Sequence, residues 1–149
     1  MNRTKARELA VHFSYEMGMN TESADELLAK RFDEEYYKTL GCENEIYKQM
    51  PDEEQLEYIT RLVKGVEEHG AELDSYIEKY AVGWKFSRIS MMASAIMRVA
   101  MYEVLYMQDI PDGAAINEAV EIAKKYEPAE TVAFINGILG SFIREEKQD

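Results

Sequence analysis

Apolar side chains recur every three or four residues along most of the chain, which is the spacing of one face of an α-helix. This pattern predicts helices at about residues 3–18, 24–38, 52–69, 71–80, 88–107, 114–126 and 128–145. Residues 39–51 lack the pattern, and we expect a loop there with at most one short helical turn. No stretch alternates apolar and polar positions with the period of a strand. The sequence therefore predicts an all-α protein.

Capping and helix-breaking residues mark the ends of several predicted helices. Ser23, Asp52 and Ser87 can each cap a helix N-terminus through a side-chain oxygen. Gln55 stands three residues after Asp52, where it can complete a capping box. Gly70 is expected to end the helix before it.

The helix at about 88–107 is apolar on nearly all sides. Its polar residues form only a narrow seam through Ser90, Ser94 and Arg98, at four-residue steps. A helix with so little polar surface is normally surrounded by other helices. We expect it to be the central helix of a bundle.

Gly137 and Gly140 fall inside the last predicted helix, where each costs roughly 1 kcal/mol relative to alanine. Either this helix ends earlier than its apolar pattern suggests, or a neighbouring element packs closely against Asn136 and Gly137.

Length and composition fit one domain spanning residues 1–149, with a frayed tail at about 145–149. No stretch of about 20 uncharged apolar residues is present, so we expect no membrane contact. The N-terminus does not look like a secretion signal. The lone Cys42 cannot form an internal disulfide. These features predict a cytoplasmic protein.

The net charge is -12, which by itself argues against nucleic acid as a partner. The charge is uneven, however, because residues 21–79 hold 17 acidic and only 7 basic side chains. The first 20 residues are the only net-basic segment, with Arg3, Lys5 and Arg7. Charges farther apart than about 8 Å are largely screened at physiological salt. A local basic patch can therefore still bind RNA, although three such cations are also what a solvated N-terminus carries.

The remaining reactive residue types give little reason to expect catalysis or a metal. His12 and His69 lie on different predicted helices, and a metal site needs several converging ligands. Cys42 has acidic neighbours, which raise the pKa of a thiol and make it less reactive. The many carboxylates include no pair in a recognisable apolar pocket. We therefore expect a binding protein with no catalytic residue, no metal and no cofactor.

Four stretches in order resemble the NusB family of bacterial transcription antitermination factors. The first is Lys5-Ala6-Arg7-Glu8-Leu9-Ala10-Val11 followed by Tyr15, and the second runs from Gly83-Trp84-Lys85 through Arg88 to Ala95-Ile96-Met97-Arg98-Val99-Ala100-Met101-Tyr102-Glu103. The others are Asp109-Ile110-Pro111 with Ala115-Ile116-Asn117-Glu118-Ala119-Val120-Glu121-Ile122-Ala123-Lys124, and Phe134-Ile135-Asn136-Gly137-Ile138-Leu139. The resemblance covers about residues 1–20 and 53–143, and it leaves 21–52 unassigned.

The resemblance implies about seven helices in two packed three-helix units. It also implies a factor that binds the boxA element of nascent ribosomal RNA together with the ribosomal protein NusE, and that joins the transcription elongation complex. The implied RNA-binding residues are Arg3, Lys5, Arg7, Tyr15, Lys124, Lys125, Glu130 and Phe134. The implied NusE-binding residues are Arg88, Met92, Ser94 and Tyr102. If both halves of the RNA set contact one site, the two ends of the chain must meet.

Two departures from the family pattern modify these expectations. Family members carry a denser arginine cluster at the N-terminus, so RNA affinity should be weak without NusE. Met92-Ala93-Ser94 replaces residues that are usually charged, which indicates a more apolar contact with NusE or self-association as a homodimer. One alternative is a protein-interaction module that has kept the fold but lost RNA affinity. Another is an accessory domain of an RNA methyltransferase, although the chain has no Gly-rich cofactor-binding segment.

Overall fold

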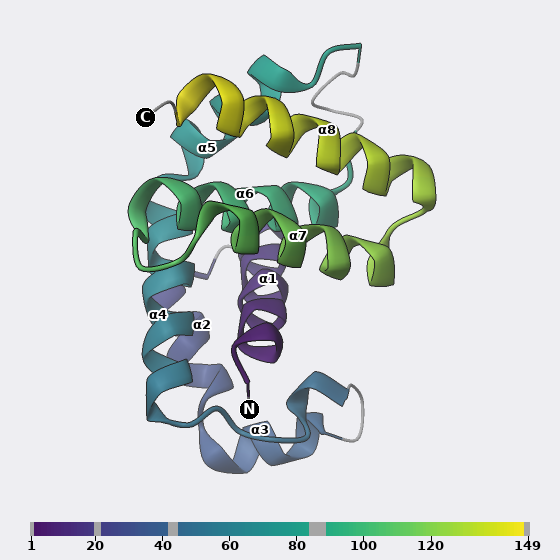
Figure 1. The fold of residues 1–149 in the computed structure, drawn as a ribbon. Helices are drawn as coiled ribbons and strands as arrows, with labels where there is room; N and C mark the ends of the chain where they lie inside the picture. Colours follow the sequence, from purple (N-terminus) through teal and green to yellow (C-terminus); the bar gives the residue numbers. More distant parts are fainter. Residues whose placement is uncertain (1, 20–21, 42–44, 84–88, 148–149) are drawn as a thin grey trace. The chain divides into compact units, whose positions relative to one another are not determined.

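The computed structural model describes residues 2–19, 22–41, 45–83 and 89–147, and within them it contains eight α-helices, one short 3-10 helix and no strand (Figure 1). The prediction of an all-α fold is confirmed. The chain divides into two compact units, Met1–Glu67 and Glu68–Asp149. Each unit has four α-helices rather than three, counting α4 with the first. The expectation of a single domain stays a prediction.

The first unit contains α1 (Arg3–Met19), α2 (Ala24–Arg31), α3 (Glu34–Leu40), the 3-10 helix η1 (Glu45–Tyr47) and α4 (Glu53–Glu68). Four aromatic rings connect α1 to η1 through its core. Phe13 meets Phe32 edge to face at 5.4 Å, Phe32 stacks on Tyr37 at 6.0 Å, and Tyr37 meets Tyr47 edge to face at 5.6 Å. Such ring pairs add about 0.5–1.5 kcal/mol each beyond their buried area.

The predicted helix at 24–38 is wrong in one respect, because it is interrupted at Phe32 and Asp33. Ser23 does cap its start, with its side chain accepting a hydrogen bond from the Glu26 amide. The Asp33 side chain then accepts one from the Tyr36 amide at 3.0 Å, so it caps a new helix, α3. Aspartate competes for backbone amides in this way, which is why it is favoured at helix starts and disfavoured inside helices.

The second unit contains α5 (Gly70–Tyr80), α6 (Met91–Tyr106), α7 (Asp112–Tyr126) and α8 (Ala129–Glu146). The helix α6 packs against each of the other three, as expected for the central helix. It begins at Met91 and is capped by Ser90, whose side chain accepts from the Ala93 amide at 3.0 Å; the predicted cap Ser87 lies outside the described residues. Gly70 does not end a helix but begins α5.

Side-chain contacts connect α5 to its neighbours in the second unit. Arg98 on α6 donates two hydrogen bonds to the Asp74 carboxylate, at 2.6 and 3.1 Å. Glu146 near the end of α8 accepts from Lys79 at 2.7 Å and also from the Tyr80 hydroxyl. These contacts raise the pKa of Lys79 to about 12 and lower the pKa of Glu146. No helix among the described residues is long and apolar enough to cross a membrane.

The expectation of a close helix contact at Gly137 is wrong. The helix α8 continues through both glycines, and a Cβ at Gly137 would meet no described atom within 4 Å. A Cβ at Gly140 would meet only the Arg144 guanidinium, at 3.4 Å. Neither glycine is required by close packing.

Candidate nucleic-acid interface

The basic residues of the first unit lie on the first two turns of α1. Asn2 caps this helix, because its side-chain oxygen accepts from the Lys5 amide at 2.9 Å. The cap fixes the helix start, and with it the direction of the Arg3 and Lys5 side chains. Lys5 is half-buried at the surface, with its amino group carried by a long flexible stem.

Arg3 is held against α4 by three contacts. Its Nε donates to the Gln55 Oε1 at 2.9 Å, its guanidinium lies 4.0 Å from the centre of the Tyr58 ring, and its Nη2 is 3.7 Å from the Glu54 Oε1. The ring covers a face of the guanidinium, whereas Gln55 and Glu54 occupy part of its N–H edge. Gln55 therefore serves Arg3 rather than completing a capping box with Asp52, although Asp52 does cap α4 through the Gln55 amide at 3.0 Å.

Arg7 does not fit the alternative in which the N-terminal cations are simply solvated. It is only 4% exposed, and its guanidinium lies 5.7 Å from the centre of the same Tyr58 ring. The neighbouring Glu8 is also buried, at 2% exposure. The apolar spacing of α1 predicted one buried stripe, but the helix is covered on more sides than that.

Tyr15 lies eight residues beyond Arg7 on α1, a rise of about 12 Å along the helix axis. It is half-buried, so part of its ring surface is available. The adjacent Glu16 pairs with Arg31 on α2 at 2.6 Å. Burial raises the pKa of Glu16 even though Arg31 opposes that shift. The negative charge beside Tyr15 is thus held by an internal partner.

The predicted RNA-binding residues of the second unit gather at the corner between α7 and α8 (Figure 1). Lys124 and Lys125 form the basic last turn of α7, and both are exposed. Glu130 is exposed in the first turn of α8, and Phe134 follows one turn later, half-buried. Lys124 pairs with Glu121 at 2.9 Å on the surface, a contact worth less than about 1 kcal/mol. A phosphate could therefore displace it easily.

The predicted partner-binding residues differ in their exposure. Arg88 lies outside the described residues. Met92 is half-buried, and Ser94 is buried at 6% exposure. Tyr102 is half-buried and packs against the ring of Tyr106, with centres 5.1 Å apart. The first residue of α6, Met91, was not among the predicted residues, although its side chain is more exposed than that of Met92, at 43% exposure.

Sequence reasoning also missed Tyr58 and Gln55, the two residues that position Arg3. Tyr58 is 4% exposed, and its spacing of three from Gln55 places both on one face of α4. That spacing is a weak signal, because the same face also carries ordinary core residues. Among the described residues, no group of three or more His, Cys, Asp or Glu side chains could hold a metal ion.

The comparisons with known proteins agree on one family. Residues 4–144 match the model of the NusB family. The chain is 37% identical over 153 residues to the transcription antitermination protein NusB of Clostridium kluyveri, covering 99% of this chain and 98% of that protein. It superimposes on the solved structure of T. maritima NusB with a TM-score of 0.73 and 28% identity, over 97% of this chain and 92% of that one.

A solved complex of the antitermination factors NusB and NusE with double-stranded RNA has the same fold, with a TM-score of 0.74. It is 22% identical and covers 95% of this chain and 96% of that one. The family match and the relative from Clostridium kluyveri both extend over nearly the whole sequence. The chain belongs to the NusB family.

Proposed function

We propose that this protein is a transcription antitermination factor that binds boxA-type RNA in nascent ribosomal RNA transcripts together with NusE. The observation that carries the proposal is that two arginines at the start of α1 lie close to the same aromatic ring, that of Tyr58 on α4. Arg3 and Arg7 lie 4.0 and 5.7 Å from the centre of the Tyr58 ring, so their positions are fixed before RNA arrives. Fixed cations and aromatic side chains are the groups that bind the backbone and the bases of single-stranded RNA.

Each unit carries its own set of proposed RNA-binding residues. Arg3 and Lys5 bind phosphates, the buried Arg7 lies behind them against the Tyr58 ring, and Tyr15 lies near the bases. In the second unit, Lys124, Lys125, Glu130 and Phe134 act at the corner of α7 and α8. The exposed Met91 and the half-buried Met92 give NusE an apolar contact at the start of α6. The protein acts in the cytoplasm with the elongation complex, and its role is binding rather than catalysis.

Weak RNA affinity of the isolated chain follows from the number of cations. Two phosphate contacts at the start of α1, from Arg3 and Lys5, give a slope of log affinity against log salt of about −1.4, at roughly −0.7 for each phosphate. The net charge of -12 opposes the approach of RNA. NusE must therefore supply further cations, and the salt slope of the ternary complex should be steeper.

The test is a titration of labelled boxA-type RNA with and without NusE, repeated at several salt concentrations. We expect tight binding only with NusE, together with a steeper salt slope. RNA binding in neither case, with NusE still bound, would instead support an interaction module that lacks RNA affinity.

The residue to probe in α1 is Lys5, because a Glu at the buried Arg7 would also destabilise the fold. Lys5→Glu should weaken RNA binding several-fold. Lys64→Glu is the matched control, since Lys64 is an exposed lysine on α4 and its replacement changes the net charge equally. Equal effects of the two variants would remove the start of α1 from the RNA site.

A further inference from the structure

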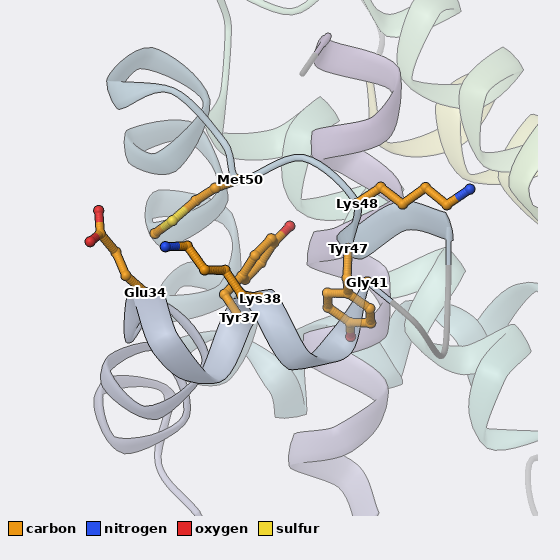
Figure 2. A pocket seen from close by; sticks show the side chains of 7 residues that line it. All are labelled: Glu34, Tyr37, Lys38, Gly41, Tyr47, Lys48 and Met50. Atoms are coloured by element: carbon orange, nitrogen blue, oxygen red, sulfur yellow. The ribbon is translucent and has the colours of Figure 1, made fainter.

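A pocket of about 330 Å³ lies between α3 and η1 in the first unit (Figure 2). Its charged lining residues are Glu34, Lys38 and Lys48, and Figure 2 shows Lys48 extending away from the other two. With charges of both signs in its lining, the pocket favours neither an anionic nor a cationic ligand. A hydrogen bond in the second unit points to a definite role instead, because it joins the elements that carry the proposed NusE and RNA contacts.

The Ser90 hydroxyl connects the start of α6 to the turn between α7 and α8. It donates to the Glu127 Oε1 at 2.6 Å, and it accepts from the Ala93 amide at 3.0 Å as the N-cap of α6. A hydroxyl has one proton to donate, so the Glu127 carboxylate receives the one that Ser90 carries. A charged acceptor makes such a bond stronger than a bond between neutral groups. The start of α6 and the turn are therefore held in one relative position.

Glu127 and Pro128 are the two residues between α7 and α8. The Glu127 backbone is extended, with φ −130° and ψ 153°, which is the conformation favoured before a proline. The Glu127 amide donates to the Ala123 carbonyl oxygen at 2.8 Å, and the Pro128 carbonyl oxygen accepts from the Val132 amide at 3.0 Å. The backbone thus ties the turn to α7 and α8, and the Glu127 side chain ties it to α6.

The link runs between the two proposed binding surfaces of the second unit. Met91 and Met92, the proposed NusE contact, directly follow Ser90 on α6. Lys125 lies two residues before Glu127, in the last turn of α7, and the other proposed RNA-binding residues of this corner lie within about two helical turns of it. Figure 1 shows α6 beginning at the end of the unit where α7 turns into α8, and α6 packs against α7.

We infer that the hydrogen bond between Ser90 and Glu127 couples NusE binding to RNA binding. NusE on Met91 and Met92 holds the first turn of α6, because helix ends otherwise fray. Ser90 then holds Glu127, and with it the basic last turn of α7. RNA meets a corner that is already ordered and pays less for ordering it. By linkage, RNA raises the affinity for NusE by the same factor. The inference rests on the proposed function and adds two positioning residues to it.

Two variants break the link with opposite changes in charge. Ser90→Asp still caps α6, but it cannot donate, and it brings a second carboxylate beside Glu127. Glu127→Ala removes the acceptor. Combining Ser90→Asp with Glu127→Gln restores the bond in the reverse direction, because the glutamine amide can donate to the new carboxylate, and it leaves the net charge unchanged. Ser75→Asp, at an exposed serine on α5, is the matched control for an added carboxylate.

The quantity to measure is the Kd for boxA-type RNA without NusE divided by the Kd with saturating NusE. Ser90→Asp and Glu127→Ala should each lower this ratio about threefold, the size expected of one hydrogen bond. The double variant and Ser75→Asp should keep the ratio of the unaltered protein. A ratio that is unchanged in both breaking variants, or that moves in opposite directions in the two, would overturn the inference. Failure of the double variant to recover the ratio would overturn it as well.

A second measurement needs no RNA and separates this inference from the proposed function. NusE added to the isotope-labelled chain should shift the nuclear magnetic resonance signals of the Lys124, Lys125 and Glu127 amides, and it should move them much less in Ser90→Asp. If the unaltered protein with NusE bound no RNA, the proposed function would fail, but these shifts would still show the link. Equal shifts in the two proteins, or none in the unaltered protein, would overturn the link itself.

Discussion

The helix α4 contacts Arg3 through the Tyr58 ring and through a hydrogen bond to Gln55. Replacing Tyr58 tests the contribution of the ring alone. The ring lies 4.0 Å from the guanidinium of Arg3 and 5.7 Å from that of Arg7. It covers a face of the Arg3 guanidinium and takes none of its N–H donors, whereas Gln55 and Glu54 contact part of the N–H edge. Tyr58→Leu removes the ring but keeps an apolar side chain. Tyr58→Phe keeps the ring and removes only the hydroxyl, so it is the matched control.

The expected size of the effect follows from the two distances. A guanidinium within about 6 Å of a ring centre gains about 0.5–1 kcal/mol at a partly exposed site. Arg3 at 4.0 Å, with 34% of its side chain exposed, should gain close to the upper value. Arg7 at 5.7 Å is near the distance limit and should gain less. A loss of about 1 kcal/mol of this pre-organisation weakens RNA binding about fivefold.

The assay is fluorescence anisotropy of labelled boxA-type RNA with NusE in excess. Tyr58→Leu should bind about fivefold more weakly than Tyr58→Phe, and the Phe variant should bind nearly as well as the unaltered protein. Both variants need a thermal unfolding curve, because a smaller side chain at this buried position costs about 1–3 kcal/mol of stability. Equal affinities of two folded variants, or tighter binding by the Leu variant, would show that the ring does not position the arginines for RNA.

Two further predictions concern charges in the first unit. Glu54→Gln should tighten RNA binding about twofold relative to the control Glu57→Gln. The reason is that the Glu54 Oε1 lies 3.7 Å from the Arg3 Nη2 and competes with a phosphate for that guanidinium. The anisotropy assay measures this difference, and equal affinities of the two variants would contradict the prediction. The pKa of Tyr37 and of Tyr47 is raised to about 12, so the stability they provide is complete below about pH 10 and lost as the pH rises toward 12. Denaturant midpoints between pH 9 and 12, read beside phenolate absorbance, measure this loss; a midpoint independent of pH over that range would refute it.

Helix positions could be predicted well wherever apolar spacing and a capping residue agree. Asp52 marks the start of α4, and the nearly uniform apolar surface of α6 identifies the central helix of its unit. The break at Asp33 could not be predicted in this way, because Leu28 and Phe32 continue the helical spacing up to it. An aspartate on a polar face looks the same in sequence whether it is solvated or caps a new helix.

The candidate site could be predicted less completely than the fold. Periodicity shows which face of α1 is apolar, but it does not show that another helix also reaches the polar face. The spacing therefore did not predict that Arg7 is only 4% exposed and lies near Tyr58. The contact between Arg3 and Gln55 joins residues 52 positions apart, and spacing along one helix carries no information about it. The predicted RNA-binding residues of the second unit lie at one corner, because they belong to the adjoining ends of two consecutive helices.

The distribution of charge explains how a protein with a net charge of -12 can still bind RNA. The two nearest groups that position Arg3 are a ring, which adds no charge, and Gln55, which is neutral, whereas the Glu54 carboxylate is more distant at 3.7 Å. A carboxylate in place of the ring or of Gln55 would position Arg3 equally well but would cancel the charge that a phosphate needs. The start of α1 can thus keep its positive charge for a phosphate in a chain whose net charge is -12.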